Sequence, residues 1–205
     1  MIGSNPERLA RAAGFLRIAG VDEAGRGPWA GPVVAAAVIL RTASLPVRID
    51  DSKRLTARAR ARALDAILSA ADVGIGIVCA EEIDRRNILQ ATLTAMTHAI
   101  ERLSRPPELV LVDGAHAPAL ALPCWPILQG DQRSYAISCA SIVAKVVRDR
   151  LMEFYDRLFP GYAFSRHKGY GTAAHARALA RLGPIALHRF SFSPVSHAAL
   201  VAAAV

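Results

Sequence analysis

The chain of 205 residues is 53% hydrophobic and carries 25 Lys and Arg against 17 Asp and Glu, which gives a formal net charge of +8. A chain of this length and composition can bury a sizeable core in one domain, which excludes a disordered polypeptide. The basic excess favours a polyanionic partner through phosphate neutralisation, although a merely basic protein without such a partner would carry the same charge.

The apolar runs and the cysteines both argue against export or a membrane. GPVVAAAVIL is too short and ALALPCWPIL is broken by prolines, whereas a spanning helix needs ~20 apolar residues. The N-terminal MIGSNPERLARAAGFL has charges and a proline where a signal peptide has an apolar centre. The three cysteines follow no CxxC pattern, so we expect reduced thiols packed as small hydrophobic side chains: Cys79, Cys124 and Cys139. These features predict a cytoplasmic protein that makes no membrane contact.

Strand and helix patterns alternate along the first half of the chain. Arg17–Val21 and Val33–Leu40 are apolar runs joined by a glycine-rich turn, a spacing that favours an antiparallel hairpin over a crossover. The second run, VVAAAVIL, is apolar throughout, so we expect it to be buried on both faces. Thr56 is in position to cap a helix that continues to about residue 71, because apolar residues recur there at helical spacing.

The remaining elements complete an α/β pattern. Strands are expected at 73–79, at 108–113 and within 125–131, with one or two helices at 81–104. A long helix is expected over 134–159, and a further one between its cap Thr172 and Gly183. We predict a mixed sheet flanked by helices over residues 1–160, with a C-terminal helical extension over 161–205 that forms one compact unit with it.

Four acidic residues lie at the ends of apolar runs or at the start of the next helix: Asp22, Glu23, Asp113 and Asp131. In a mixed sheet these ends can meet at one edge, where clustered carboxylates repel one another unless divalent cations neutralise them. Oxygen ligands indicate magnesium or manganese rather than zinc, and a carboxylate cage in a basic protein suggests two-metal phosphoryl transfer. For each acid taken singly, a helix cap or loop charge is the alternative, and Asp131 is a plausible cap.

Five blocks in order carry a family resemblance: GVDEAGRGPWAGPVVAAAVIL, DSKRLT, LVDG, GDQRSYAISCASIVAKVVRDR and HKGYGT. They resemble the signature blocks of type 2 ribonuclease H, the family of bacterial ribonuclease HII, from about Arg17 to Pro194. The resemblance implies a ribonuclease H-like fold and an endoribonuclease that depends on Mn²⁺ or Mg²⁺. The implied substrates are RNA/DNA hybrids and DNA with embedded ribonucleotides, cleaved 5′ of the ribonucleotide to leave a 3′-hydroxyl and a 5′-phosphate during ribonucleotide removal from DNA.

The resemblance also assigns roles to individual positions. The family's catalytic metal ligands correspond to the four acids: Asp22, Glu23, Asp113 and Asp131. Its GRG segment matches Gly25, Arg26 and Gly27, whose backbone would meet the 2′-hydroxyl that distinguishes RNA from DNA. Tyr170 matches a tyrosine that would stack on the sugar after the ribonucleotide, with a core tyrosine as the alternative. The other expected substrate contacts lie in the matching blocks: Lys53, Ser138, Lys145, Lys168 and Thr172.

The long helix is expected to carry one polar stripe at steps of four, three and four residues: Ser134, Ser138, Ser141 and Lys145. This face can look toward the site. Asp149 follows Lys145 by four residues, and an ion pair within the helix explains it without metal, so it stays outside the ligand set. His116 and His167 could assist proton transfer, with solvated loop histidines as the preferred interpretation.

Three alternative functions share parts of this pattern. A catalytically silent hybrid-binding protein would be expected to lack a ligand acid, and another nuclease of the same fold would not be expected to carry both GRG and GYGT. Ribonuclease HIII has a sizeable N-terminal domain, for which the residues ahead of the first strand leave no room. Trp29, Gln132 and Arg133 depart mildly from the family pattern. We expect a monomer, and the tail SFSPVSHAALVAAAV shows no clear clamp-binding motif.

Overall fold

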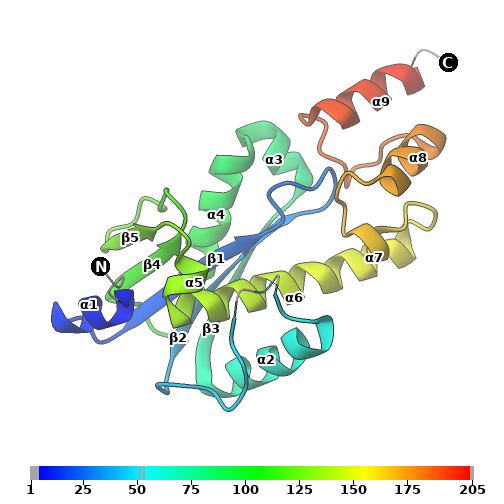
Figure 1. Cartoon of the computed structure of the whole chain (residues 1–205). Helices are drawn as coiled ribbons and strands as arrows, with labels where there is room; N and C mark the ends of the chain where they lie inside the picture. The colour runs from blue at the N-terminus through cyan, green and yellow to red at the C-terminus, as the bar shows by residue number, and fades with distance from the viewer. Residues whose placement is uncertain (1–4, 51, 53, 204–205) are drawn as a thin grey trace.

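A mixed five-stranded sheet lies at the centre of the protein (Figure 1). The computed structural model describes residues 5–50, 52 and 54–203, and the strand order in its sheet is β3-β2-β1-β4-β5. Strand β1 pairs antiparallel with β2 and parallel with β4, so the predicted hairpin and mixed sheet are confirmed. The strands are β1 (Ile18–Ala24), β2 (Val33–Leu40), β3 (Ala71–Val78), β4 (Leu109–Asp113) and β5 (Cys124–Ile127).

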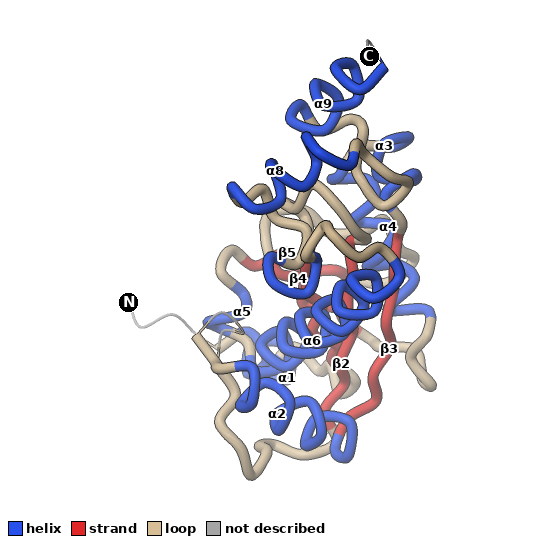
Figure 2. The backbone as a smooth tube through the Cα atoms, turned by 90° about the vertical axis from the view of Figure 1, so that its right-hand side faces the viewer, coloured by secondary structure: helices blue, strands red, loops and turns tan. Residues whose placement is uncertain are grey.

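Helices cover both faces of this sheet. Helix α6 crosses one face with α2 beside it, and α3 and α4 lie on the other side (Figures 1 and 2). A separate cluster of buried side chains fills each interface, with Ile67 and Ile142 on the α6 side and Met96 on the α4 side. The helices are α1 (Pro6–Ala12), α2 (Ala57–Ala70), α3 (Ala80–Arg86), α4 (Ile88–Glu101), α5 (Gly130–Arg133), α6 (Tyr135–Leu158), α7 (Phe164–His167), α8 (Ala173–Leu182) and α9 (Ser193–Ala203).

Two glycines let the helices approach the sheet closely. A Cβ on Gly20 of β1 would overlap the backbone of Ala136 in α6, and a Cβ on Gly76 of β3 would overlap the carbonyl of Ala95 in α4. A side chain at either position would push a helix away from the sheet, because the interior has no spare volume. Strand β2 is buried except at its last two residues, as its apolar sequence predicts.

Two boundaries are decided by hydrogen bonding that the sequence pattern does not reveal. Strand β1 continues through Asp22 and Glu23 to Ala24, because all three residues remain paired with β2. The helical region after β3 is split into α3 and α4 by Asn87, which has a φ of 72°. The Asn87 side chain then accepts hydrogen bonds from the first N–H groups of α4, so it starts the second helix.

Two sequence interpretations are wrong. Asp131 does not cap the long helix, because it lies in the separate α5, and the Ser134 side chain caps α6 by accepting from the Ile137 N–H. Cys79 is exposed rather than packed as a small hydrophobic side chain. Cys139 is buried as expected, and all three cysteines are free thiols.

The C-terminal extension stands at the far end of α6 (Figure 1). Helix α8 begins at its predicted cap Thr172 and ends at Gly183. Beyond α8, the Arg189 N–H donates to the carbonyl of Trp29, so the extension bonds to the turn between β1 and β2. Within the described part of the chain, every helix is too short or too polar to cross a membrane.

Candidate active site

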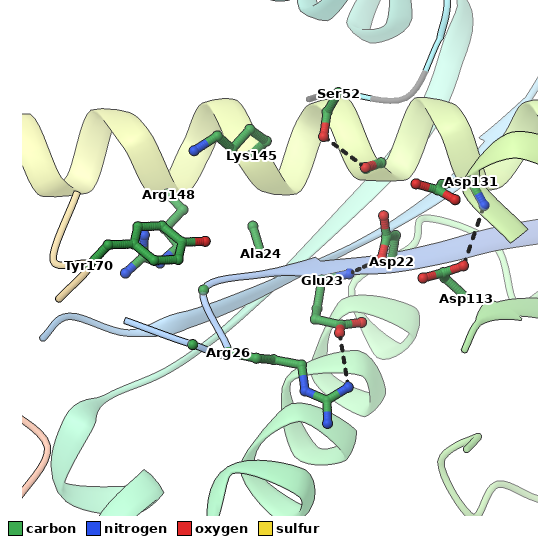
Figure 3. A pocket seen from close by; sticks show the side chains of 13 residues that line it. Asp22, Glu23, Ala24, Arg26, Ser52, Asp113, Asp131, Lys145, Arg148 and Tyr170 are labelled. Carbon is green, nitrogen blue, oxygen red and sulfur yellow. Dashed lines mark hydrogen bonds and ion pairs between the residues drawn. The ribbon is translucent and has the colours of Figure 1, made fainter. Parts of the chain in front are cut away.

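One pocket lies where the ends of β1 and β4 meet helix α6 (Figure 3). Strands β1 and β4 are parallel neighbours, so their carboxyl ends lie at the same edge of the sheet. The pocket has a volume of about 340 Å³. Its walls include all four predicted acids, the Gly25-Arg26-Gly27 turn, Lys145 and Tyr170.

The four acids come from three elements. Asp22 and Glu23 are neighbours on β1, Asp113 ends β4, and Asp131 lies in α5. The Asp113 Oδ1 accepts hydrogen bonds from the backbone N–H of Gly130, at 2.6 Å, and of Asp131, at 3.4 Å. The carboxylate of Asp113 thus holds the start of α5 against the edge of the sheet, which brings Asp131 to the same pocket.

Burial and mutual repulsion disfavour negative charge on the two β1 acids. Asp22 is 5% exposed, and burial raises its pKa well above the ordinary carboxyl value, with Glu23 and Asp113 raising it further. Burial also raises the pKa of Glu23, whereas the guanidinium of Arg26 lowers it. The Arg26 Nη1 lies 3.4 Å from the Glu23 Oε1. Arg26 therefore offsets only part of the repulsion on this side of the pocket.

The donor set fits a hard divalent cation. Every candidate ligand is a carboxylate, and Mg²⁺ and Mn²⁺ prefer oxygen ligands of this kind. Within the described part of the chain, however, no three His, Cys, Asp or Glu side chains stand close enough together to hold an ion. A bound cation would remove the repulsion from Glu23 and Asp113 that raises the pKa of Asp22.

The turn after β1 has a conformation that only glycine adopts easily. Gly25 has a φ of 97°, and a Cβ on it would overlap the Arg148 side chain. The turn residues Gly25, Arg26 and Gly27 all line the pocket next to the β1 acids. A backbone this close to the pocket can offer its own N–H groups to a ligand.

Tyr170 stands at the opposite end of the pocket from Asp113 and Asp131 (Figure 3). Tyr170 as a residue is 44% exposed, so the alternative interpretation as a core tyrosine is wrong. The guanidinium carbon of Arg148 lies 5.9 Å from the centre of the Tyr170 ring, and this cation–π contact helps to fix the position of the ring. Tyr170 therefore presents an aromatic surface to whatever enters the pocket.

Lys145 and Asp149 form the ion pair that their spacing on α6 predicts. The Lys145 Nζ lies 2.8 Å from the Asp149 Oδ1, and Arg60 of α2 lies 3.9 Å from the other oxygen. Lys145 lines the pocket, whereas Asp149 does not. Ser141, one step earlier on the stripe, lines it too and shares a 3.0 Å hydrogen bond with Ser52.

Some expected contacts lie away from the pocket. Lys168 pairs with Glu153 at 2.7 Å, and Thr172 caps α8. Ser138 is 8% exposed and its hydroxyl donates to backbone carbonyls, including that of Ser134 at 3.1 Å. Lys53 lies outside the described residues.

One histidine interpretation is wrong. His116 is exposed in a loop, as expected, but His167 is 8% exposed and lies buried within the extension, at the end of α7. Its Nε2 is 2.8 Å from the Tyr162 carbonyl oxygen, and its Nδ1 accepts from the Gly169 N–H. Both ring nitrogens are thus used to hold the loop that leads to Tyr170.

Sequence reasoning missed Arg148, although a signal for it was present. Arg148 follows Lys145 by three residues and so continues the polar stripe at steps of four, three, four and three. It is 1% exposed as a residue, yet it reaches the pocket wall beneath Tyr170. An arginine on a stripe that faces the core needs internal partners, and only the tertiary structure identifies them.

The sheet and the helix across it define a ribonuclease H-like fold. Solved structures share the fold: ribonuclease H2 from Pyrococcus horikoshii OT3 superimposes with a TM-score of 0.76 at 22% identity, covering 91% of this chain and 98% of that one. Bst-RNase HIII in complex with Mn²⁺ superimposes with a TM-score of 0.70 at 19% identity, covering 100% of this chain and 76% of that one. The predicted ribonuclease H-like fold is confirmed.

Sequence similarity identifies the family. The profile of the family Ribonuclease HII matches residues 19–195. Ribonuclease HII of Syntrophotalea carbinolica is 53% identical over 190 residues, covering 92% of this chain and 90% of that protein. Ribonuclease HII of Rhizorhabdus wittichii is 53% identical over 189 residues, covering 92% of this chain and 94% of that protein. The chain belongs to the ribonuclease HII family.

Proposed function

We propose that the protein is a divalent-metal-dependent endoribonuclease that hydrolyses RNA in RNA/DNA hybrids and cleaves duplex DNA 5′ of an embedded ribonucleotide. The products carry 3′-hydroxyl and 5′-phosphate ends, and the reaction serves ribonucleotide removal from DNA. One observation carries the proposal: a single pocket is lined by four carboxylates and also by the glycine turn and Tyr170. The carboxylates suit cation-assisted hydrolysis, and the turn and the tyrosine suit recognition of a ribose.

The ligands of the catalytic Mn²⁺ or Mg²⁺ are the four acids: Asp22, Glu23, Asp113 and Asp131. When bound, such ions lower the pKa of the attacking water and stabilise the leaving oxygen. Because burial raises the pKa of Asp22, the charged carboxylate is unfavourable without a cation beside it. A bound cation would stabilise the charged form, which favours metal binding. The Gly130 N–H on the Asp113 carboxylate keeps that ligand oriented.

Recognition of the ribonucleotide divides between two parts of the pocket. The backbone of Gly25, Arg26 and Gly27 meets the 2′-hydroxyl, which DNA lacks. The exposed ring of Tyr170 stacks on the sugar of the next nucleotide and so reports a deoxyribose there. A deoxyribonucleotide at the first position would leave the backbone donors without a partner, which costs binding free energy.

Five cationic and polar side chains contact the phosphates of the duplex in this proposal: Lys53, Ser138, Lys145, Lys168 and Thr172. The formal net charge of +8 supports such a partner, because each neutralised phosphate releases counterions. Lys168 has to exchange its pairing with Glu153 for a phosphate to play this part. We further propose that the protein acts in the cytoplasm as a monomer.

The decisive experiment uses a DNA duplex with one ribonucleotide, incubated with Mg²⁺, with Mn²⁺ or with EDTA. We expect one cut 5′ of the ribonucleotide in either metal and none in EDTA, with the ends mapped by ligation and phosphatase sensitivity. Cutting in EDTA, or equal cutting of an all-DNA duplex, would overturn the proposal. Binding without cutting in any metal would instead indicate a silent hybrid-binding protein.

A further inference from the structure

Two arginines are buried beside the pocket without an acidic partner. Arg189 is fully buried and Arg148 is 1% exposed, and neither forms an ion pair with any described residue. A buried guanidinium without a carboxylate costs free energy unless its N–H groups are bonded. Burial and the charge of Arg148 lower the pKa of Arg189 to about 9, which leaves it charged at neutral pH. Their donors must therefore be satisfied by the backbone.

Arg189 binds the turn after β1 through its whole guanidinium. Its Nη2 donates to the carbonyl of Gly25 at 2.5 Å and its Nη1 to that of Arg26 at 2.8 Å. Its Nε and Nη2 both donate to the carbonyl of Gly31, at 3.1 and 2.9 Å. One side chain from the C-terminal extension thus donates hydrogen bonds to carbonyls at both ends of the turn.

Arg148 holds a different part of the same region. Its donors reach the carbonyls of Ala30 (3.1 Å), Pro32 (2.9 Å) and Lys168 (2.9 Å). These contacts tie the return into β2 to the loop that carries Tyr170. Arg189 is the one of the two that binds the carbonyls of Gly25 and Arg26 themselves.

The orientation of those carbonyls decides where the neighbouring N–H groups point. A trans peptide directs its C=O and the N–H of the next residue to opposite sides, and the described residues contain no cis peptide bond. Since the carbonyls of Gly25 and Arg26 both point at Arg189, the N–H groups of Arg26 and Gly27 both point away from it. Arg189 is buried behind the turn and the turn lines the pocket, so these N–H groups face the pocket.

The two N–H groups are available to a ligand. Neither the Arg26 N–H nor the Gly27 N–H donates a hydrogen bond to another described residue. Successive N–H groups in a turn form a concave donor pair that binds an electronegative atom. The oxygen of a 2′-hydroxyl is such an acceptor, and deoxyribose offers none at that place.

We propose that Arg189 is a positioning residue for ribose recognition: by binding the carbonyls of Gly25 and Arg26, it holds the N–H groups of Arg26 and Gly27 toward the pocket as a donor pair for the 2′-hydroxyl oxygen. The inference rests on the proposed function and adds to it the residue that sets the shape of the turn. Arg189 itself touches no substrate atom, because it is fully buried behind that turn.

The test is a binding measurement that needs no catalysis. In EDTA, the dissociation constants of two duplexes are compared, identical except that one has a ribonucleotide where the other has a deoxyribonucleotide. Arg189→Lys keeps the positive charge but cannot span three carbonyls, since an ammonium is a point donor and a guanidinium a planar fork. We expect the wild-type protein to prefer the ribonucleotide duplex and Arg189→Lys to lose about tenfold of that preference. Affinity for the all-DNA duplex should change by no more than about twofold, because phosphate contacts remain.

Two control variants separate positioning from general stability. Arg181→Lys makes the same substitution at an exposed arginine of α8, whose Nη2 lies 3.3 Å from the Gly161 carbonyl, and should keep the preference. Ile67→Ala removes a buried side chain from α2 and should lower the melting temperature without changing the preference. An unchanged preference in Arg189→Lys, or an equal loss in Ile67→Ala, would overturn the inference.

A milder variant covers the case in which Arg189→Lys does not fold. Asp84 of α3 accepts from the N–H groups of Phe190 (2.8 Å) and Ser191 (2.9 Å), next to Arg189 in sequence. Asp84→Asn should loosen this segment and lose a smaller part of the preference, and an unchanged preference would then count against the inference. The proposed function is judged separately, since cleavage of the ribonucleotide duplex by the wild-type protein depends on none of these variants.

Discussion

The two sides of the pocket handle buried charge in opposite ways. On the acidic side, the burial of Asp22 and the charges of Glu23 and Asp113 raise the pKa of Asp22, and Arg26 offsets little of this. On the side of the glycine turn, Arg148 and Arg189 are buried as deeply, but their guanidinium groups donate to backbone carbonyls. Backbone carbonyls of the chain compensate the charge on the turn side, whereas the charge on the acidic side would be compensated by the divalent cation of the proposed function.

This difference suits the acidic side to cation binding and gives the turn side a fixed shape. A carboxylate cluster that repels itself binds cations well because its charge is not already compensated. A turn in which the carbonyls of Gly25, Arg26 and Gly31 are bonded to a buried guanidinium cannot relax easily, so its free N–H groups stay in one arrangement. Substitutions on the acidic side and on the turn side should therefore have different effects on activity, on substrate selectivity and on the stability of the fold.

The largest effect is expected on the acidic side. Asp113→Asn replaces a charged ligand by a neutral amide, so the rate of ribonucleotide cleavage should fall by roughly 10³-fold or more, while duplex binding in EDTA changes little. Asp149→Asn is the matched control on α6, because Asp149 does not line the pocket and the change weakens only its pairs with Lys145 and Arg60, so its loss of activity should be much smaller. Wild-type turnover in Asp113→Asn would remove that residue from the site.

A smaller, selective effect is expected at Tyr170. Tyr170→Ala should lose a stacking contact of about 1–3 kcal/mol, by analogy with aromatic stacking on bases. The loss should be greater for a single embedded ribonucleotide than for a continuous RNA–DNA hybrid, because a ribose in the stacking position already fits the ring less well. The quantity to measure is the ratio of kcat/KM on the two substrates, together with the melting temperature. Since Tyr170 as a residue is 44% exposed, an equal loss on both substrates with a lower melting temperature would contradict this role.

Stability should change in the opposite direction to activity at Asp22. Burial raises the pKa of this carboxyl, so between its ordinary and its raised pKa the folded state keeps a proton that the unfolded chain has lost. The free energy of unfolding therefore falls as the pH rises through that window. At neutral pH without metal, Asp22→Asn should raise the melting temperature by about 2–4 °C, which is ~1 kcal/mol for a domain of this size.

The gain at Asp22 has two internal checks. It should shrink as the pH is lowered, and vanish below the ordinary carboxyl pKa, where the wild-type side chain is protonated in both states. Added Mg²⁺ should raise the melting temperature of the wild-type protein more than that of Asp22→Asn. A lower melting temperature for Asp22→Asn in EDTA at neutral pH would mean that the charged carboxylate stabilises the fold.

The smallest effect is expected at Lys168, which does not line the pocket. If its ammonium leaves Glu153 to contact a phosphate, Lys168→Ala should reduce the slope of log K against log salt by about 0.9 for duplex binding. Glu153→Gln is the complementary variant: it frees Lys168 from its 2.7 Å partner and should strengthen binding modestly. An unchanged salt slope in Lys168→Ala would leave Lys168 with its structural contact to Glu153 alone.

Local patterns carried most of the fold prediction. The hairpin of β1 and β2, the caps at Thr56 and Thr172, and the pairing of Lys145 with Asp149 depend on residues close in sequence, and all are confirmed. Asp131 was predicted at the site, and its alternative interpretation as a cap of the long helix is wrong, because the short α5 is held by a contact with Asp113 that periodicity does not express. The pocket does bring the four predicted acids together, since parallel strands β1 and β4 end at one edge.

The order of residues in the chain thus determined which elements form, which acids end them, and the family to which the chain belongs. Tertiary structure alone decided that His167 is buried, that Tyr170 is exposed, and that Arg148 and Arg189 bind one turn from α6 and from the extension. The physical reason is separation along the chain. An arginine at 189 and a carbonyl at 25 obey no local spacing rule, because their contact exists only after the extension has packed against the turn.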